Sequence, residues 1–571
     1  MKQTANDQNY KKESTPVVDK QSNGKSQYKP SVKPIVKQMA YSKMTTVKKL
    51  INLGSVALFL ASTTTVWGAN NRPNILFILS DDHAWQAVSA YGESRHLIQT
   101  PNIDRLAQEG MRFDRFLVNN SLCGPSRASF ITGTYSHING FYNNSNCRFD
   151  GSQITVPKLL QKAGYQTALI GKWHLESDPT GFDYWEILKG QGIYYNPPMI
   201  RDGKPVKHEG YITDIIADLS MDWLKKRDPS KPFMLFCWNK APHREWEPAL
   251  RDLDFDHDRV YPPPDSLFDD YSGRGQAEHT QNMTIARTMK LNEDNKLTDP
   301  KDLTPEQKKI WDAYYFPRNE AFQKKNLAGN ALTEWKYNRF MHDYLACIKD
   351  VDDNVGRILK YLDDTGLATN TIVIYSSDQG FFLGEHGWFD KRWIFEESAR
   401  TPFLIRWPGI IKADSVNQDL VANIDVAETF LQIAGMHLPD RMQGNSFLPL
   451  LKGTTPADWR SAFYYHYYEF PAFHHVRPHY GIITTNYTLV HFYKPDATVE
   501  RLANIRPAMI PDDYWELFDR EKDPGEMRSV FGNPAYAGVQ TKLMQEVSRL
   551  RDQLKDPAKD DPKSFGNVKD D

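Results

Sequence analysis

Carboxylate and amide side chains stand in pairs directly after apolar runs of this 571-residue chain. Asp81 and Asp82 follow one such run, and Asp378 and Gln379 follow another. Three carboxylates brought together would repel one another unless a cation lay among them. Carboxylate and amide oxygens favour a hard ion, Ca²⁺ or Mg²⁺, over zinc. We therefore predict a divalent metal site here, although an isolated Asp81-Asp82 pair would be interpreted as a turn with a helix cap.

A cysteine near the start of a predicted helix is the second candidate for chemistry. Cys123 lies just before Pro125, which favours the first turn of a helix, and Gly133 is a suitable end for that helix. The N-terminus of a helix favours an anion, because the helix dipole is positive there. A buried structural cysteine is the alternative. Arg127 argues against it, since a nearby buried cation needs an anionic partner.

Continuous apolar runs must position these side chains. None of the runs alternates polar with apolar residues, and this continuity predicts strands that are buried on both faces. Each run is followed closely by carboxylate, Lys or His side chains. Open α/β sheets bind ligands beyond the carboxyl ends of their strands, so the polar clusters are expected to converge on one edge of one sheet. The four runs are residues 74–79, 165–170, 233–238 and 371–375.

Helix-like segments alternate with these strands, which predicts an α/β domain. After about residue 455, Tyr-rich and β-branched runs at 462–470, 481–493 and 514–518 predict a small antiparallel sheet, followed by a helix at 539–554. The predicted organisation is a disordered or over-called extension at 1–43, a signal peptide at 44–69, a catalytic domain at 70–455, a small-sheet subdomain at 456–555 and a charged tail at 556–571.

Residues 44–69 have the order of a signal peptide: two lysines, the apolar run 50–60, then small residues up to Ala69. The apolar run is shorter than the roughly 20 residues that a membrane span requires. We therefore expect export to the periplasm or the cell exterior, with no stable membrane span after cleavage; a retained signal anchor is the alternative. A signal starting at Met44 also favours Met44 over Met1 as the start, which N-terminal sequencing of the precursor would test.

The composition is that of a packed protein, with 40% apolar and 25% charged residues. The formal charge of −2 and a pI near 6.8 give no support to nucleic-acid binding, which usually needs a basic surplus. The cysteines form no CxxC pair, so neither a zinc site nor a disulfide framework is expected. They are Cys123, Cys147, Cys237 and Cys347.

Two segments resemble the signatures of the sulfatase family, the formylglycine-dependent enzymes of the alkaline-phosphatase-like superfamily. They are Cys123-x-Pro125-Ser126-Arg127-x-x-x-Ile131-Thr132-Gly133 and Gly164-Tyr165-x-Thr167-x-x-x-Gly171-Lys172-x-His174. The resemblance covers roughly residues 71–535. It implies the fold of that superfamily: a large mixed, mostly parallel sheet sandwiched by helices, with a smaller C-terminal α+β domain built on an antiparallel sheet.

The resemblance also implies how a sulfate ester would be hydrolysed. A formylglycine-generating maturation enzyme would oxidise Cys123, and the formylglycine hydrate would be the nucleophile. Residue 123 would hold a divalent ion, Ca²⁺ with Mg²⁺ as the alternative, together with Asp81, Asp82, Asp378 and Gln379. Many relatives carry Asn in place of Gln379. In the same resemblance, Arg127 and Lys172 steady the hydrate, and His174 acts as a base on its second hydroxyl. His243 and Lys391 contact the sulfate, and His243 also protonates the leaving oxygen.

Shorter segments at 241–246, 271–274 and 464–467 look like those of bacterial carbohydrate sulfatases of the N-acetylglucosamine-6-sulfatase type. This resemblance implies that the substrate is the 6-O-sulfate of N-acetylglucosamine in host glycans, and thus a role in glycosaminoglycan degradation. The long irregular insertion at 244–325 and the stretch 474–480 are expected to select the substrate. The candidate substrate residues are Arg244, Arg477 and His479, with interdomain packing as the alternative for the last two.

Other functions remain open from the sequence alone. An iduronate-2-sulfatase-like enzyme, an arylsulfatase, and a phosphoester or phosphonate hydrolase of the same superfamily could share the metal carboxylates. A non-catalytic glycan-binding protein is the least expected function, because a binder has no need of both His174 and His243.

Overall fold

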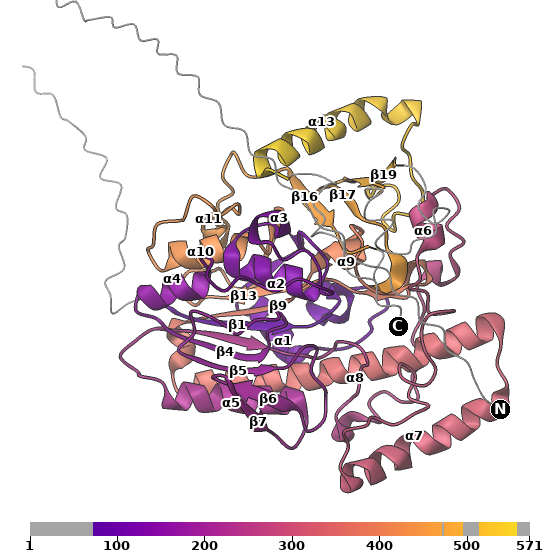
Figure 1. Cartoon of the computed structure of the whole chain (residues 1–571), viewed down its shortest axis with the longest axis horizontal. Helices are drawn as coiled ribbons and strands as arrows, with labels where there is room; N and C mark the ends of the chain where they lie inside the picture. The colour runs from indigo at the N-terminus through magenta and orange to yellow at the C-terminus, as the bar shows by residue number, and fades with distance from the viewer. Residues whose placement is uncertain (1–71, 471–472, 495–512, 557–571) are drawn as a thin grey trace, which may run out of the picture. The chain divides into compact units, whose positions relative to one another are not determined.

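The apolar runs that precede the polar clusters form neighbouring parallel strands at the centre of a ten-stranded sheet in the computed structural model (Figure 1). Their order across the sheet is β9-β1-β8-β4, and their side chains are buried almost throughout. The prediction of one sheet edge that collects the polar clusters is confirmed. The strands are β1 (Asn74–Ser80), β4 (Gln166–Lys172), β8 (Phe233–Trp238) and β9 (Thr371–Ser377).

The outer strands make the sheet a mixed one. Beyond β9, β13 (Phe403–Arg406) pairs antiparallel with both β9 and β2 (Met111–Phe113), and β14 (Ser415–Asn417) closes that side. Beyond β4, β5 (Tyr184–Leu188) is parallel. The strands β6 (Pro198–Arg201) and β7 (Lys204–Lys207) then complete the sheet as an antiparallel hairpin.

Helices cover both faces of this sheet, as Figure 1 shows. Alternate β1 residues belong to different cores: Leu76 and Ile78 pack with one set of helices, and Ile75 and Phe77 with the other. The first set is α1 (Pro101–Gln108), α5 (Ile212–Lys226) and α8 (Gly329–Asp364). The second set is α2 (Cys123–Thr132), α4 (Val156–Lys162) and α10 (Asp425–Ile433). The predicted α/β sandwich is therefore confirmed.

A separate four-stranded antiparallel sheet lies in the C-terminal part, as predicted. The run 481–493 is two strands rather than one, because a turn after Thr484 reverses the chain. Trp393 and Phe395 pack in one core with side chains of the small sheet. Both sheets belong to one compact unit, so the boundary at 455/456 stays a prediction. The elements are β16 (Ala462–Tyr467), β17 (His479–Thr484), β18 (Tyr487–Phe492), β19 (Tyr514–Asp519) and α13 (Ala537–Leu554).

The insertion at 244–325 is irregular only in its first part, so that prediction is wrong for its end. The 21-residue helix α7 (Pro305–Lys325) closes it. The Thr304 hydroxyl accepts a hydrogen bond from the Gln307 backbone N–H, and the Gln307 side-chain oxygen accepts one from the Thr304 backbone N–H. This is a capping box, with Pro at the first helical position. That signal is legible in the sequence. Earlier come the short helices η3 (Leu250–Asp252), η4 (Asp265–Phe268) and α6 (Gln276–Thr280).

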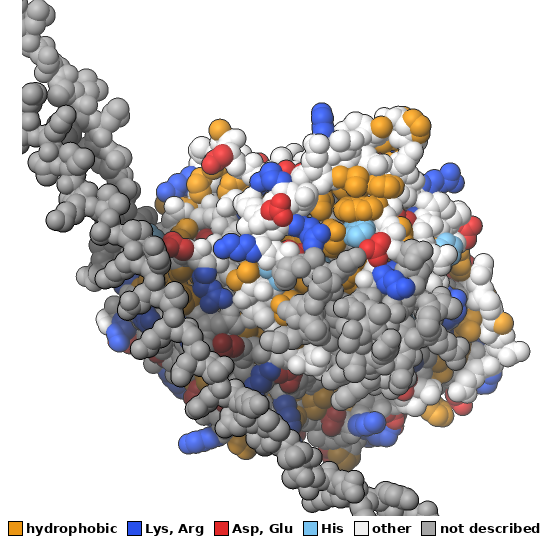
Figure 2. All heavy atoms as spheres, turned by 45° about the horizontal axis from the view of Figure 1, so that its top comes forward, with side chains coloured by type: hydrophobic (Ala, Val, Ile, Leu, Met, Phe, Trp, Pro, Cys, Tyr) orange, Lys and Arg blue, Asp and Glu red, His pale blue; other side chains and the backbone are white. Residues whose placement is uncertain are grey.

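The structure describes residues 72–470, 473–494 and 513–556, so the predicted extension and signal peptide, and nearly all of the tail, lie outside it. Within those residues no helix is long and apolar enough to cross a membrane. Acidic and basic side chains are interspersed on the face shown in Figure 2, in keeping with the small net charge.

Shorter elements include β3 (Phe116–Leu117), α3 (Ser136–Asn139), β10 (Phe382–Leu383), β11 (Phe389–Asp390), α9 (Glu396–Ala399), β12 (Arg400–Thr401), β15 (Val421–Ala422) and α11 (Leu448–Leu451).

Candidate active site

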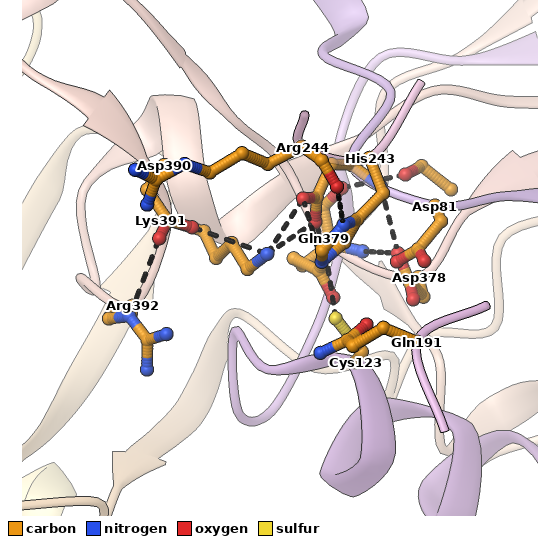
Figure 3. A network of polar contacts seen from close by, with 12 residues as sticks. Asp81, Cys123, Gln191, His243, Arg244, Asp378, Gln379, Asp390, Lys391 and Arg392 are labelled. Atoms are coloured by element: carbon orange, nitrogen blue, oxygen red, sulfur yellow. Dashed lines mark hydrogen bonds and ion pairs between the residues drawn. The ribbon is translucent and has the colours of Figure 1, made fainter. Parts of the chain in front are cut away.

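The predicted reactive residues meet at the carboxyl edge of the central strands, around the start of α2 (Figure 3). One ligand atom from each of Asp81, Asp82, Cys123 and His243 lies within 4.8 Å of the others. The Gln379 amide nitrogen is 3.9 Å from the Cys123 sulfur and donates a hydrogen bond to Asp82. Residues from three strand ends and one helix thus surround a single small volume.

Each carboxylate of this cluster faces a buried cation. The Nζ of Lys391 lies 2.7 and 2.8 Å from the Asp82 oxygens, and Lys172 contacts Asp81. Arg127 donates from Nε to Asp378 at 2.9 Å. Buried charges are stabilised only by such pairing. The anionic partner of Arg127 is thus Asp378, so Arg127 does not by itself argue against a structural role for Cys123.

Burial and neighbouring charge pull the carboxyl groups in opposite directions. Burial and the Asp81 charge raise the pKa of Asp378 to about 8, and burial raises the pKa of Asp82 to about 6. Burial also disfavours ionised Asp81, but the charges of Lys172 and Arg127 hold its pKa well below the usual value. An added divalent cation would favour the ionised form of all three carboxyl groups.

The donor set fits a divalent metal. Asp81 Oδ1 and Gln379 Oε1 are buried and have no hydrogen-bond partner among the described residues. Buried acceptors without a partner are rare and mark a place where an ion can bind. Asp378 is turned toward Arg127 and toward backbone N–H groups, and the Gln379 amide faces Asp82 and Cys123 with its nitrogen. Asp81 and Asp82 are therefore the better oriented oxygen donors. The cluster can therefore hold a metal ion.

Cys123 is fully buried at the first position of α2. Burial and the Asp81 charge raise the pKa of its thiol well above the usual value. A thiol held in the neutral form is a poor nucleophile, because the thiolate is the reactive species. At the next residue, a Cβ on Gly124 would come within 2.4 Å of the Phe141 ring, so the start of this helix leaves no room for a larger residue.

Two histidines border the same volume. Burial and the charge of Lys172 lower the pKa of both His174 and His243 well below the usual value, so both rings are neutral at rest. The Nδ1–H of His243 donates to the Arg244 carbonyl oxygen at 2.5 Å, which leaves Nε2 facing the site, 3.7 Å from Asp82. The Nδ1 of His174 is buried with no hydrogen-bond partner in the described part of the chain. Each ring therefore offers one nitrogen for a proton.

Arg244, a predicted substrate residue, lies next to His243. Its guanidinium donates two hydrogen bonds to Asp294, at 2.6 and 2.7 Å, and lies over the rings of Phe389 and Phe473. Together with His243 it lines a cavity of about 610 Å³. The neutralised, planar guanidinium is held in a fixed position beside the reactive groups.

The prediction that Arg477 and His479 contact the substrate is contradicted by their positions. His479 is completely buried; its Nδ1–H donates to the Arg477 carbonyl at 2.7 Å and its Nε2 accepts from the Ile394 backbone at 3.1 Å. Both ring nitrogens are thus used inside the protein. The guanidinium of Arg477, 1% exposed, lies over the Tyr514 ring. Packing, the alternative drawn from the sequence, describes both residues.

Several residues of the site were not predicted. His474 Nε2 lies 2.8 Å from Asp390, and Asp390 lies 3.2 Å from the Lys391 ammonium. Arg392 pairs with Glu469 of the C-terminal part at 2.6 Å. The triplet 390–392 of alternating charge was a visible signal in the sequence, but its partners come from segments about 80 residues away, which no local pattern reveals.

Comparison with known proteins decides the family. The sulfatase family profile matches residues 73–436, more than half of the chain. The chain belongs to the sulfatase family. A second profile, for the C-terminal part of N-sulphoglucosamine sulphohydrolase, matches residues 384–553 of this sulfatase. The protein is accordingly a sulfuric ester hydrolase, as the two sequence signatures implied.

Individual relatives agree with this assignment. An N-acetylglucosamine-6-O-sulfatase of Bacteroides thetaiotaomicron is 47% identical over 85% of this sulfatase and 87% of its own length. A solved structure of a protein in complex with its substrate, D-glucosamine-2-N,6-O-disulfate, is 47% identical and has a TM-score of 0.81 over 86% of this chain and 99% of that one. A phosphonate monoester hydrolase of Agrobacterium radiobacter, 20% identical, shares the fold alone, with a TM-score of 0.60 over 85% of this chain and 96% of that one.

Proposed function

We propose that this sulfatase removes the 6-O-sulfate of N-acetylglucosamine in sulfated glycans, as a step of glycosaminoglycan degradation. The observation that carries the proposal is the 47% identity to an N-acetylglucosamine-6-O-sulfatase over 85% of the chain. The cation-rich site supports it, because Lys172, Lys391 and Arg127 converge where an anionic sulfate ester would react.

The proposal includes a modified residue and a metal. Oxidation of Cys123 by a maturation enzyme would give formylglycine, whose hydrate supplies a nucleophile and a second hydroxyl that lets sulfate leave without attack by water. Calcium is the proposed ion, with magnesium as the alternative, since the donors are oxygens. Its proposed ligands are residue 123, Asp81, Asp82, Asp378 and Gln379.

The side chains of this chain then divide the remaining work. Lys391 and Lys172 neutralise the sulfate, and Arg127 holds Asp378 in place. His243 is proposed to carry a proton at Nε2 for the leaving oxygen. The negative charge of a bound sulfate would offset the positive charge of Lys172, which lowers the pKa of His243. A bound sulfate would therefore raise the proton affinity of the His243 Nε2. His174 is proposed to accept a proton at its unpaired Nδ1.

A comparison of substrates tests this function. The enzyme is expected to release sulfate from 6-O-sulfated N-acetylglucosamine with kcat/KM at least about tenfold above that for iduronate 2-sulfate or a simple aryl sulfate. A higher kcat/KM for iduronate 2-sulfate would shift the proposal to the iduronate-2-sulfatase-like alternative. Faster cleavage of an aryl phosphate or phosphonate than of the matching sulfate would sink the proposal for the reaction itself.

The remaining predictions from the sequence are kept as proposals. They are the division into a catalytic domain at 70–455 and a small-sheet subdomain at 456–555, and export to the periplasm or cell exterior through the signal peptide at 44–69. Export fits a substrate found in host glycans outside the cell. Cell fractionation with sequencing of the mature N-terminus would test it, and a mature protein beginning at or near Asn70 in the exported fraction is the expected result.

A further inference from the structure

A buried lysine beside the reactive groups has no acidic partner within 4.0 Å among the described residues. Lys240 lies two residues after the end of β8 and is 3% exposed. Within the described residues no carboxylate oxygen lies within 4.0 Å of its Nζ; the ammonium lies 4.7 Å from the centre of the Tyr194 ring and donates a long hydrogen bond, 3.4 Å, to the Arg244 carbonyl. Buried ammonium groups are rarely left in this state, because burial disfavours the charge.

Lys240 lines the same cavity as His243 and Arg244. The cavity of about 610 Å³ is lined by Gln191, Tyr194, Lys240, His243, Arg244 and Phe473, among others. Gln191 accepts a hydrogen bond from Lys172, and Tyr194 donates one to the His243 carbonyl. An atom bound by Lys240 would therefore belong to the same molecule whose sulfate is held near His243.

Among the described residues, none of the carboxylates that line the cavity pairs with Lys240 within 4.0 Å; they are Glu245, Glu247, Glu293, Asp299 and Asp302. Lys296 is engaged by backbone carbonyls and lies 3.9 Å from Asp343. Glu247 lines the cavity, but burial raises its pKa to about 7, so it is a weak counterion at neutral pH. Burial and the charge of Lys172 lower the pKa of Lys240 to about 8, so the lysine is largely charged at neutral pH.

We propose that Lys240 binds a second anionic group of the substrate, a sulfate or carboxylate other than the sulfate that is cleaved. This inference rests on the proposed function and refines its substrate class: the preferred substrate carries two negative groups, either on one sugar ring or on neighbouring rings. A bound anion would pair with the buried Lys240 ammonium, for which the described residues supply no carboxylate within 4.0 Å.

Substrates that differ by one charge test the inference. The measured set is 6-O-sulfated N-acetylglucosamine, 2-N,6-O-disulfated glucosamine, and a disaccharide in which the 6-O-sulfated glucosamine carries a neighbouring uronic acid. Lys240→Met is expected to lower kcat/KM for at least one doubly charged substrate on the order of tenfold, through KM, and to leave the singly charged substrate within about twofold. The affected substrate identifies the anion as sulfate or carboxylate, and Lys240→Arg is expected to restore much of the loss.

Controls separate this inference from the proposed function and from misfolding. Lys301→Met removes an exposed lysine from the same cavity wall and is expected to change none of the ratios. With the wild type, at least one of glucosamine 2-N-sulfate and a uronic acid disaccharide should inhibit more strongly than N-acetylglucosamine, a measurement that needs no variant. Equal inhibition by all three, or an equal loss on all substrates in Lys240→Met, overturns the inference. No turnover of any 6-O-sulfated glucosamine by the wild type overturns the proposed function instead.

Discussion

Two of the three carboxylates beside Cys123 are paired with cations that are also proposed to bind the substrate. Lys391 holds Asp82 and Lys172 holds Asp81, yet both lysines are the groups proposed to bind the sulfate. A sulfate that draws these cations away leaves the carboxylates without counterions in a buried site, where unpaired charge is costly. A divalent metal among the carboxylates would meet that need, which explains why acidic and basic groups are so closely interleaved here.

Metal binding is expected to depend on pH through the same carboxyl groups. The pKa values of Asp378, about 8, and Asp82, about 6, are raised, so these two groups bind more protons in the folded metal-free protein than in the unfolded chain. Their contribution to stability therefore falls as pH rises from about 4 to 8. A metal must displace these protons. Calorimetric titration of chelator-treated protein should show Ca²⁺ affinity rising between pH 6 and 8, by up to about tenfold per pH unit for each proton released. An affinity that is flat over this range would contradict the assignment of Asp82 and Asp378 as ligands.

Residue 123 is expected to be oxidised in active protein. Mass spectrometry of the peptide that carries it should show a loss of about 18 Da relative to the thiol form, the difference between CH₂SH and CHO. Cys123→Ala is expected to lower kcat by at least about 10³-fold while the protein remains folded. An active preparation in which every copy of residue 123 is an unmodified thiol would defeat this mechanism.

His243 is expected to matter most where the leaving group is basic. His243→Ala should lower kcat on a sugar sulfate by about 10²- to 10⁴-fold, because the departing alkoxide needs a proton. A nitrophenyl sulfate, whose phenolate leaves without one, should lose much less. Equal losses on both substrates would indicate that His243 binds the sulfate rather than protonating the leaving oxygen.

At the scale of elements, periodicity and chain direction were enough to predict the strands that carry the site. The runs that became β1, β4, β8 and β9 are continuous and apolar, and their ends bear the reactive side chains. Contacts between distant segments, such as that of His474 with Asp390, could not be predicted, because they leave no local pattern. The burial of Arg477 and His479 could not be predicted either, because it depends on how the small sheet packs against the segment around Ile394.

One glycine fixes the distance between two of these strands. Gly171 has a φ of +112°, and a Cβ there would lie 1.9 Å from the Trp238 carbonyl oxygen of the neighbouring strand. Gly171→Ala is therefore expected to lower the free energy of unfolding by about 3 kcal/mol or more and to reduce kcat by displacing Lys172. Gly203→Ala is the matched control, since Gly203 has a φ of +80° with nothing within 4 Å. Its cost should be about 1 kcal/mol, measurable by denaturant unfolding.

At the scale of the whole molecule, the small sheet is tied to the site by charge as well as by its aromatic core. Glu469 accepts a hydrogen bond from Arg392 at 2.6 Å and one from the Asn144 backbone, while Asn144 accepts one from Gly124 beside Cys123. The C-terminal part therefore helps to hold the start of α2. This connection is why the two sheets are expected to unfold together.

Breaking this tie is expected to destabilise the molecule as a unit. Glu469→Gln leaves the Arg392 charge buried, which should lower the free energy of unfolding by about 3 kcal/mol and lower kcat as well. Glu546→Gln removes a carboxylate from an exposed pair with Arg549 and should cost less than about 1 kcal/mol. Thermal unfolding followed by both tryptophan fluorescence and circular dichroism should give one shared transition, and two separate transitions would show independent domains.

The complete burial of Cys123 sets an order of events in time. An enzyme that oxidises this side chain, as proposed, would have to reach it, yet in the folded protein Cys123 and the other residues of α2 are buried. Under the proposed maturation, oxidation would therefore compete with folding of the nascent chain. The active fraction of a preparation would then be decided during synthesis and would not rise on later incubation of the folded protein with the maturation enzyme.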